Sequence, residues 1–147
     1  MSCCYRENVG GATCDIIDNM DSTIWRRLSA DSDQLYRSGQ FGKAVEGYSE
    51  IISVYQDTLD SPDLALIYNN RGHAKYMMVD FYKAKDDYDR ALKLDPCLAV
   101  AYYNRGTIHY RMGDFDLALA DFKMSIKLEP SNPEFIEGFH SCQQCLS

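Results

Sequence analysis

Two kinds of side chain in this sequence could support catalysis or metal binding: six cysteines and three histidines. Cys142 and Cys145 have the CxxC spacing found in zinc sites, but a zinc site needs four ligands. Further ligands could come only from Cys3, Cys4 or His140, at no defined spacing. No histidine stands at a motif distance from a nucleophile, and there is no phosphate loop, dinucleotide fingerprint or metal-hydrolase motif. We therefore expect free thiols, no metal, no cofactor, no catalytic residue and no enzymatic activity.

Two asparagines, Asn70 and Asn104, offer a different chemistry, which is hydrogen bonding to a polypeptide backbone. Asparagine is a poor helix former in the middle of a helix, so its presence there needs a reason. Its side-chain amide carries a donor and an acceptor together. This combination suits the backbone of an extended peptide.

Length and charge narrow the classes of protein and partner. The chain has 147 residues, enough for one folded domain, and a net charge of −7, which argues against nucleic acid as a partner. No stretch is long and apolar enough for a membrane span, and acidic residues interrupt the segment where a secretory signal would lie. We therefore expect a cytoplasmic protein with reduced cysteines. Lipidation of Cys3 or Cys4 remains open.

The asparagines lie at the same position of an internal repeat. Residues 65–98 and 99–132 align without a gap over 34 residues, and a weaker copy lies at 25–64. Apolar residues at helical spacing, interrupted at Gly113 and stopped at Pro130, predict two helices in each unit. Asp86, Asp87 and Asp89 are interleaved with lysine and arginine and are expected on a solvated outer face.

The ends of the chain differ from the repeats. Asn132 and Pro133 form a helix start signal, and apolar residues then recur at helical spacing, which predicts a capping helix over 133–145. Residues 1–22 have little pattern and are expected to be flexible or partly helical. The domain then spans residues 23–147.

The repeat resembles the tetratricopeptide repeat, a 34-residue helix–turn–helix with glycine at position 8, alanine at position 20 and proline at position 32. Two positions depart from that pattern: arginine replaces leucine at position 7 (Arg71, Arg105), and Lys75 and His109 replace tyrosine at position 11. The first unit is degenerate, with Asp31 and Ser32 in place of leucine and glycine. The resemblance implies an all-α fold, a short right-handed α-solenoid of three units closed by the capping helix.

The resemblance also implies that the first helix of each unit lines a concave groove. The expected groove residues are Tyr36, Asn69, Asn70, His73, Tyr76, Tyr103, Asn104, Thr107, Tyr110 and Arg111. Tyrosine recurs at position 12 of all three units, and these tyrosines either line the groove or pack against neighbouring helices.

The expected function is that of an adaptor that binds an extended peptide of a partner protein in this groove. The alternative is a structural subunit of a larger assembly, bound through its convex or edge surfaces. Chaperone C-terminal tails are not expected as partners, because the basic clamp that the family uses for them is matched only at Asn70, and Asp33 would repel a carboxylate. A monomer is expected, with self-association left open.

Overall fold

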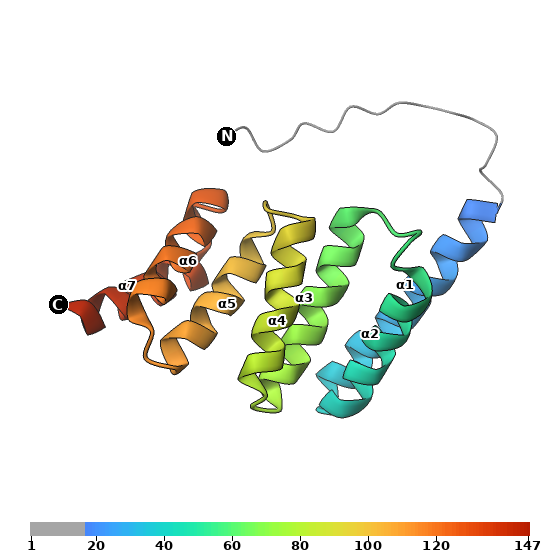
Figure 1. Ribbon diagram of the computed structural model, residues 1–147, viewed down its shortest axis with the longest axis horizontal. Helices are drawn as coiled ribbons and strands as arrows, with labels where there is room; N and C mark the ends of the chain where they lie inside the picture. The colour runs from blue at the N-terminus through green and yellow to red at the C-terminus, as the bar shows by residue number, and fades with distance from the viewer. Residues whose placement is uncertain (1–16) are drawn as a thin grey trace.

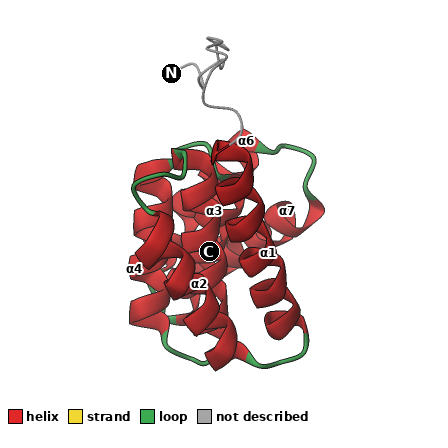
Figure 2. Ribbon diagram, turned by 90° about the vertical axis from the view of Figure 1, so that its right-hand side faces the viewer, coloured by secondary structure: helices red, strands yellow, loops and turns green. Residues whose placement is uncertain are grey.

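A computed structural model describes residues 17–147 of this chain, with side chains described from Ser22 onward. The described part contains seven α-helices and no strand, which confirms the all-α class (Figures 1 and 2). Residues 1–16, most of the segment expected to be flexible, lie outside the described residues. The helices are α1 (Ile17–Arg37), α2 (Phe41–Tyr55), α3 (Ser61–Met77), α4 (Phe81–Leu94), α5 (Ala99–Arg111), α6 (Phe115–Leu128) and α7 (Pro133–Leu146).

The helices stack in chain order into two layers. Each helix packs against the next one in sequence, and the odd-numbered helices also contact one another, α1 with α3, α3 with α5 and α5 with α7. Within the described residues, no such contact joins α2 to α4 or α4 to α6. The odd-numbered layer is therefore the tighter one. This makes it the concave, inner side of the stack, which Figure 1 shows as a row of helix pairs.

A small residue and an aromatic ring lock the two helices of each unit together. The alanines at position 20, Ala44, Ala84 and Ala118, are fully buried. A Cβ atom added at Gly72 would lie 2.9 Å from the Tyr88 ring, and one added at Gly106 would lie 3.0 Å from the Phe122 ring. At these distances an added Cβ atom would push the facing ring aside, so the two glycines let the helices approach closely.

The degenerate first unit keeps this close approach with a different pair of residues. Ser32 occupies the position of the missing glycine and is 2% exposed. Its partner on α2 is Gly47, where an added Cβ would collide with the Ser32 hydroxyl. The Ser32 hydroxyl donates instead to the carbonyl of Leu28, at 2.8 Å. The small residue has moved from the first helix to the second, which is why the sequence pattern looks broken although the packing is retained.

The arginines at position 7 join three helices through charged hydrogen bonds. In the second unit, Arg71 on α3 holds Asp87 on α4 with two parallel bonds, Nε to Oδ2 at 2.9 Å and Nη2 to Oδ1 at 2.7 Å. Its remaining nitrogen, Nη1, donates to Ser49 on α2 at 3.1 Å. Lys75 adds a second cation to the same carboxylate, at 2.9 Å.

The third unit repeats the arrangement with the same spacing. Arg105 on α5 holds Asp121 on α6 at 2.8 and 2.7 Å and reaches back to Asp89 on α4 at 3.0 Å. His109 takes the position of Lys75, with its Nε2 at 3.7 Å from Asp121 Oδ2. The substitutions at positions 7 and 11 are therefore compensated by the aspartate at position 23.

The expectation that Asp86, Asp87 and Asp89 share a solvated face is wrong for Asp87, whereas the Asp89 side chain stays 36% exposed. Asp86 is exposed, but Asp87 is 2% exposed and Asp89 is bound to Arg105 and Lys85. Asp87 follows buried Ala84 by three residues and precedes buried Tyr88, so it lies on the packed face of α4. A signal for this pairing was present in the sequence, because arginine and aspartate recur 16 residues apart in both units.

Replacing Asp87 should test the strength of the buried pair. Asp87→Asn leaves Arg71 and Lys75 partly buried without their counter-charge, so we expect the free energy of unfolding to fall by about 3–5 kcal/mol. The matched control Asp86→Asn, one residue away on the exposed face, should change it by less than about 0.5 kcal/mol. Urea denaturation followed by circular dichroism measures both, and equal effects would show that the pair does not hold the unit together.

One of the turns between paired helices, the α3–α4 turn, has a strained backbone conformation. Two of the three turns place a glycine at positive φ, Gly39 at 80° and Gly113 at 83°, but the equivalent residue of the α3–α4 turn is Val79 at 62°. A β-branched residue is strained in this conformation. Val79 is also 71% exposed, so packing gives it no compensation.

Val79→Gly should therefore stabilise the protein. Relief of the strain exceeds the backbone entropy that glycine adds to the unfolded chain, so we expect a gain of about 0.5–1 kcal/mol. The reciprocal change Gly113→Val should destabilise the protein by about 1–2 kcal/mol. Thermal or urea unfolding gives both values, and a loss of stability in Val79→Gly would contradict the assignment of strain.

Candidate functional site

A cavity of about 550 Å³ opens on the concave side between α3 and α5. Most of its wall comes from these two helices, and α4 and α7 each add one residue, Tyr88 and Glu134. The lining residues are Leu66, Asn69, Asn70, His73, Tyr76, Tyr88, Val100, Tyr103, Asn104, Thr107 and Glu134.

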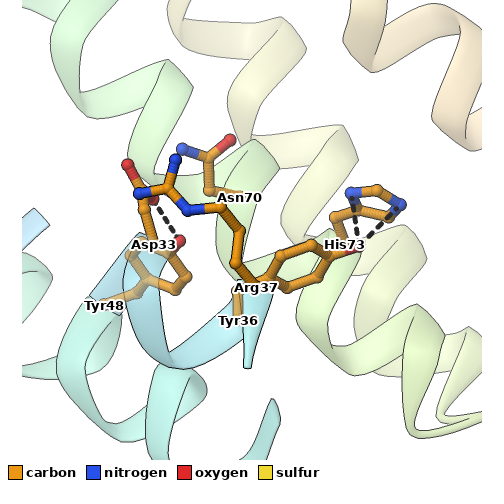
Figure 3. A pocket seen from close by; sticks show the side chains of 6 residues that line it. All are labelled: Asp33, Tyr36, Arg37, Tyr48, Asn70 and His73. Atoms are coloured by element: carbon orange, nitrogen blue, oxygen red, sulfur yellow. Dashed lines mark hydrogen bonds between the residues drawn. The ribbon is translucent and has the colours of Figure 1, made fainter. Parts of the chain in front are cut away.

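A second cavity, of about 250 Å³, adjoins the first toward α1. It is lined by Asp33, Tyr36, Arg37, Tyr48, Asn70 and His73 (Figure 3). Because Asn70 and His73 line both cavities, the two are parts of one surface, which we call the groove.

The structure places all but two of the expected site residues in the groove. The exceptions are Tyr110 and Arg111 at the end of α5. Tyr110 packs edge-on against Phe115, with ring centroids 5.5 Å apart, and its hydroxyl lies 3.6 Å from the Cys145 sulfur of α7. Arg111 is exposed and lines neither cavity. The capping helix α7 therefore lies beside the end of α5 that was expected to bind a ligand.

The recurring tyrosines at position 12 serve packing in every unit. Each lies against the phenylalanine that begins the second helix of its own unit, with centroids 5.3 Å apart for Tyr36–Phe41 and 5.4 Å apart for Tyr76–Phe81. Tyr36 and Tyr76 also present part of their surface to the groove. Tyr36 and Tyr76 therefore both line the groove and pack against a neighbouring helix, whereas Tyr110 packs against Phe115 and does not line the groove.

Three side-chain amides are linked across the floor of the groove. Asn104 on α5 donates to the Asn69 oxygen at 3.0 Å, and Asn69 on α3 donates in turn to the Asn70 oxygen at 3.3 Å. Asn69 is 4% exposed, so it acts as the buried link between the other two. Within the described residues, the Asn70 amide nitrogen and the Asn104 amide oxygen have no hydrogen-bond partner. The groove thus presents a free donor on α3 and a free acceptor on α5.

His73 lies at the centre of the groove, between two tyrosine rings. The Tyr36 ring is 5.2 Å away and the Tyr76 ring 6.2 Å away, centroid to centroid, and the Tyr36 hydroxyl lies 3.3 Å from His73 Nδ1. Burial lowers the pKa of the imidazole below its usual 6.5, and the negative charge of Glu134 opposes this shift. The imidazole is therefore neutral at pH 7.

The formal charges of the groove lie at its two ends. At the α1 end, Arg37 extends between Asp33 and Asn70, as Figure 3 shows, and the Tyr48 hydroxyl donates to Asp33. Glu134 lies at the α7 end.

These charged residues were not among the expected site residues. Asp33 and Arg37 occupy positions 9 and 13 of the first unit, which lie on the groove-facing side of its first helix. The helical spacing of the sequence could therefore have identified them. Glu134 lies outside the repeats, and nothing in the periodicity indicates it.

The cysteines of the CxxC sequence have separate surroundings. Buried Cys142 donates to the Phe115 carbonyl oxygen at 3.3 Å, and burial raises the pKa of its thiol, whereas Cys145 is exposed beside Tyr110. In the part of the chain that the structure describes, no three residues among histidine, cysteine, aspartate and glutamate are placed to hold a metal ion. The same residues contain no helix with the length and apolar character that crossing a membrane requires.

The titration of His73 provides a test of the groove's electrostatics. We expect its pKa, measured by NMR, to lie below 6.5, and Glu134→Gln to lower it further because the opposing negative charge is removed. Because the unfolded chain then binds the proton more readily, His73 should reduce stability as the pH falls through 6.5. Glu50→Gln, on the exposed face of α2, is the matched control and should leave the pKa unchanged. A rise in Glu134→Gln would contradict the described geometry.

Comparison with known proteins supports the repeat and the fold. A family model described as the tetratricopeptide repeat matches residues 65–96 and 99–132. Among solved structures, the Arabidopsis OM64 TPR domain is 25% identical with a TM-score of 0.74, and the alignment covers 83% of this chain and 96% of that domain. The first TPR of Spaghetti (RPAP3), bound to the HSP90 peptide SRMEEVD, is 20% identical with a TM-score of 0.75, covering 83% of this chain and 92% of that one.

A third similar structure is the second TPR domain of human RPAP3 in complex with the HSP70 peptide SGPTIEEVD. It is 23% identical with a TM-score of 0.71, and the alignment covers 82% of this chain and 97% of that one. The expectation that chaperone tails are excluded as partners is therefore wrong, since domains of this shape hold such tails. That expectation rested only on the positions of the family's basic clamp. It did not consider Arg37, which lines the same cavity as Asn70.

The repeat match and the seven-helix stack agree with each other. Residues 65–96 and 99–132 therefore match the tetratricopeptide repeat, and the described residues have an all-α helical-repeat fold.

Proposed function

We propose that this protein is an adaptor that holds an extended peptide segment of a partner protein in the groove. The observation that carries the proposal is the free donor of Asn70 and the free acceptor of Asn104, which face an open cavity from the same position of adjacent units. An extended peptide presents carbonyl and N–H groups in alternation along its backbone. Such a backbone can accept from one amide and donate to the other.

The surroundings of the two amides favour an extended segment over a compact ligand. The larger and the smaller cavity lie side by side and share Asn70 and His73 in their linings. Tyrosine rings on α1, α3 and α5 supply apolar surface for side chains at little cost in conformational entropy, because their rings already pack against neighbours.

Arg37 at the α1 end of the groove can bind a carboxylate of the bound segment and offset the repulsion of Asp33, which lines the same cavity. The Arg37 guanidinium has no ion-pair partner among the described residues, and it shares its cavity with the free amide nitrogen of Asn70. A guanidinium and an amide donor together can bind a carboxylate. We therefore propose chaperone C-terminal tails of the kind bound by the similar domains as the first peptides to test, with the carboxylate placed at Arg37 and Asn70.

Removing the two amides should weaken peptide binding without harming the fold. Each lost hydrogen bond costs about 0.5–1.5 kcal/mol, so Asn70→Ala with Asn104→Ala should raise the Kd by roughly tenfold or more. Fluorescence anisotropy with labelled SRMEEVD and SGPTIEEVD peptides, or with a peptide from an identified partner, measures the change. Gln143→Ala with Gln144→Ala removes two exposed amides from α7 and is the matched control.

A second candidate function is that of a structural subunit bound through an edge of the stack, and one surface favours it. Met77, Met78, Val79 and Tyr82, around the α3–α4 turn, are all exposed large apolar residues, and Tyr82 is 73% exposed. Exposed apolar clusters of this kind occur at protein interfaces. If Tyr82→Ser abolished binding to a partner while the double asparagine variant retained full affinity, the groove proposal would be wrong.

Three finer proposals complete this view. The repeat units are similar to those of a small animal protein called tetratricopeptide repeat protein 32. We also propose that the protein acts in the cytoplasm and is a monomer.

A further inference from the structure

The α7 end of the groove combines one carboxylate with three aromatic rings. Tyr76, Tyr88 and Tyr103 line the larger cavity, and Glu134 borders it. Apart from His73, which burial keeps neutral, and the tyrosines, whose phenols are neutral at pH 7, Glu134 is the one acid or base in this lining. The cavity therefore carries a net negative charge, although no described cation faces it.

The packing of α7 holds this carboxylate at the cavity. A Cβ atom added at Gly138, one turn after Glu134, would lie 2.8 Å from the Tyr103 ring, so only glycine lets α7 approach α5 this closely. The Tyr103 ring is stacked on Phe135 at 5.0 Å and tilted against Phe122 at 5.5 Å, centroid to centroid. Gly138, which weakens α7 as a helix, thus has a role in docking it, and the wall around Glu134 is closely packed.

The charge of Glu134 is close enough to both neighbouring rings to affect their titration. Burial raises the pKa of Tyr103, and the negative charge of Glu134 raises it further. The same charge opposes the lowering of the His73 pKa. Within the described residues, Glu134 has no ion-pair partner. A glutamate in the first turn of a helix is favourable in itself, but that preference does not require it to border a cavity.

We propose that this end of the groove binds a cationic side chain, lysine or arginine, of the bound segment. The charge lies against the Glu134 carboxylate, and the alkyl stem or guanidinium plane lies against Tyr103 and Tyr76. Aromatic faces attract cations electrostatically, and a carboxylate beside them adds a direct counter-charge. The inference rests on the proposed peptide binding and adds the class of residue that the segment must carry.

The proposal also sets the direction of the bound segment. Glu134 at the α7 end favours a base, whereas the α1 end holds one acid and one base, Asp33 and Arg37, and carries no net charge. A segment with a basic residue toward one end then has one favourable orientation, in which that residue lies at the α7 end, whereas the reversed segment leaves Glu134 without a counter-charge.

A small cationic probe tests the pocket without relying on any peptide. Nα-acetyl-lysine methylamide, titrated into the full chain at low ionic strength, should shift the NMR signals of Tyr103 and His73, whereas the neutral norleucine analogue should not. Glu134→Gln should weaken lysine-probe binding by roughly fivefold, and the matched control Glu50→Gln should leave it unchanged. Equal responses to the two probes, or no response to the lysine probe, would overturn the proposal.

A peptide experiment separates this inference from the proposed function. Peptides selected from a random display library on the wild-type chain should carry lysine or arginine at one fixed place, and selection on Glu134→Gln should lose that preference. Selected peptides without a basic residue would overturn the cationic pocket and leave peptide binding intact. Failure to select any peptide, together with a positive lysine-probe titration, would refute the proposed function but keep the pocket.

Discussion

The bidentate bond between arginine at position 7 and aspartate at position 23 is the constraint on which the rest of this structure depends. Arg71 and Arg105 each connect both helices of their own unit and the second helix of the unit before. The free-energy cost of desolvating two charges offsets much of their electrostatic attraction. Such a pair therefore fixes the relative positions of the helices more than it adds net stability. Its planar fork geometry accepts only one relative placement of the helices. The stack is therefore held in register by polar contacts inside an otherwise apolar core.

This register carries over directly to the groove. Asn70 precedes Arg71 and Asn104 precedes Arg105, so each groove amide is adjacent in sequence to a fixed anchor. Adjacent residues on a helix point about 100° apart, and the anchor and the amide therefore face the interior and the concave side, respectively. Asn69, buried between them, links the two amides across the units. The same short segment thus builds the scaffold and aligns the hydrogen-bonding groups.

The sequence predicted the repeated part of this arrangement better than the parts that occur once. Helical periodicity and the 34-residue repeat predicted the all-α stack and placed Asn70, His73 and Asn104 on one face, because these features depend on local spacing. Asp87 was misassigned because charge interleaving says nothing about a partner on another helix. Glu134 was missed, and Tyr110 was wrongly placed in the groove, for a different reason. Their surroundings depend on how α7 packs against α5, a contact between distant segments that no repeat encodes.

The neighbour-by-neighbour contacts of the stack have a consequence for biosynthesis. Because every helix contacts only those one or two places away in the chain, contact order is low, and units can fold as they leave the ribosome. The helices that carry Asn70 and Asn104 emerge before α7. Until α7 docks, Tyr103 and Phe122 lack the cover that it provides, and the carboxylate end of the groove does not exist. A nascent chain would therefore expose aromatic surface at a growing edge before it could discriminate among ligands.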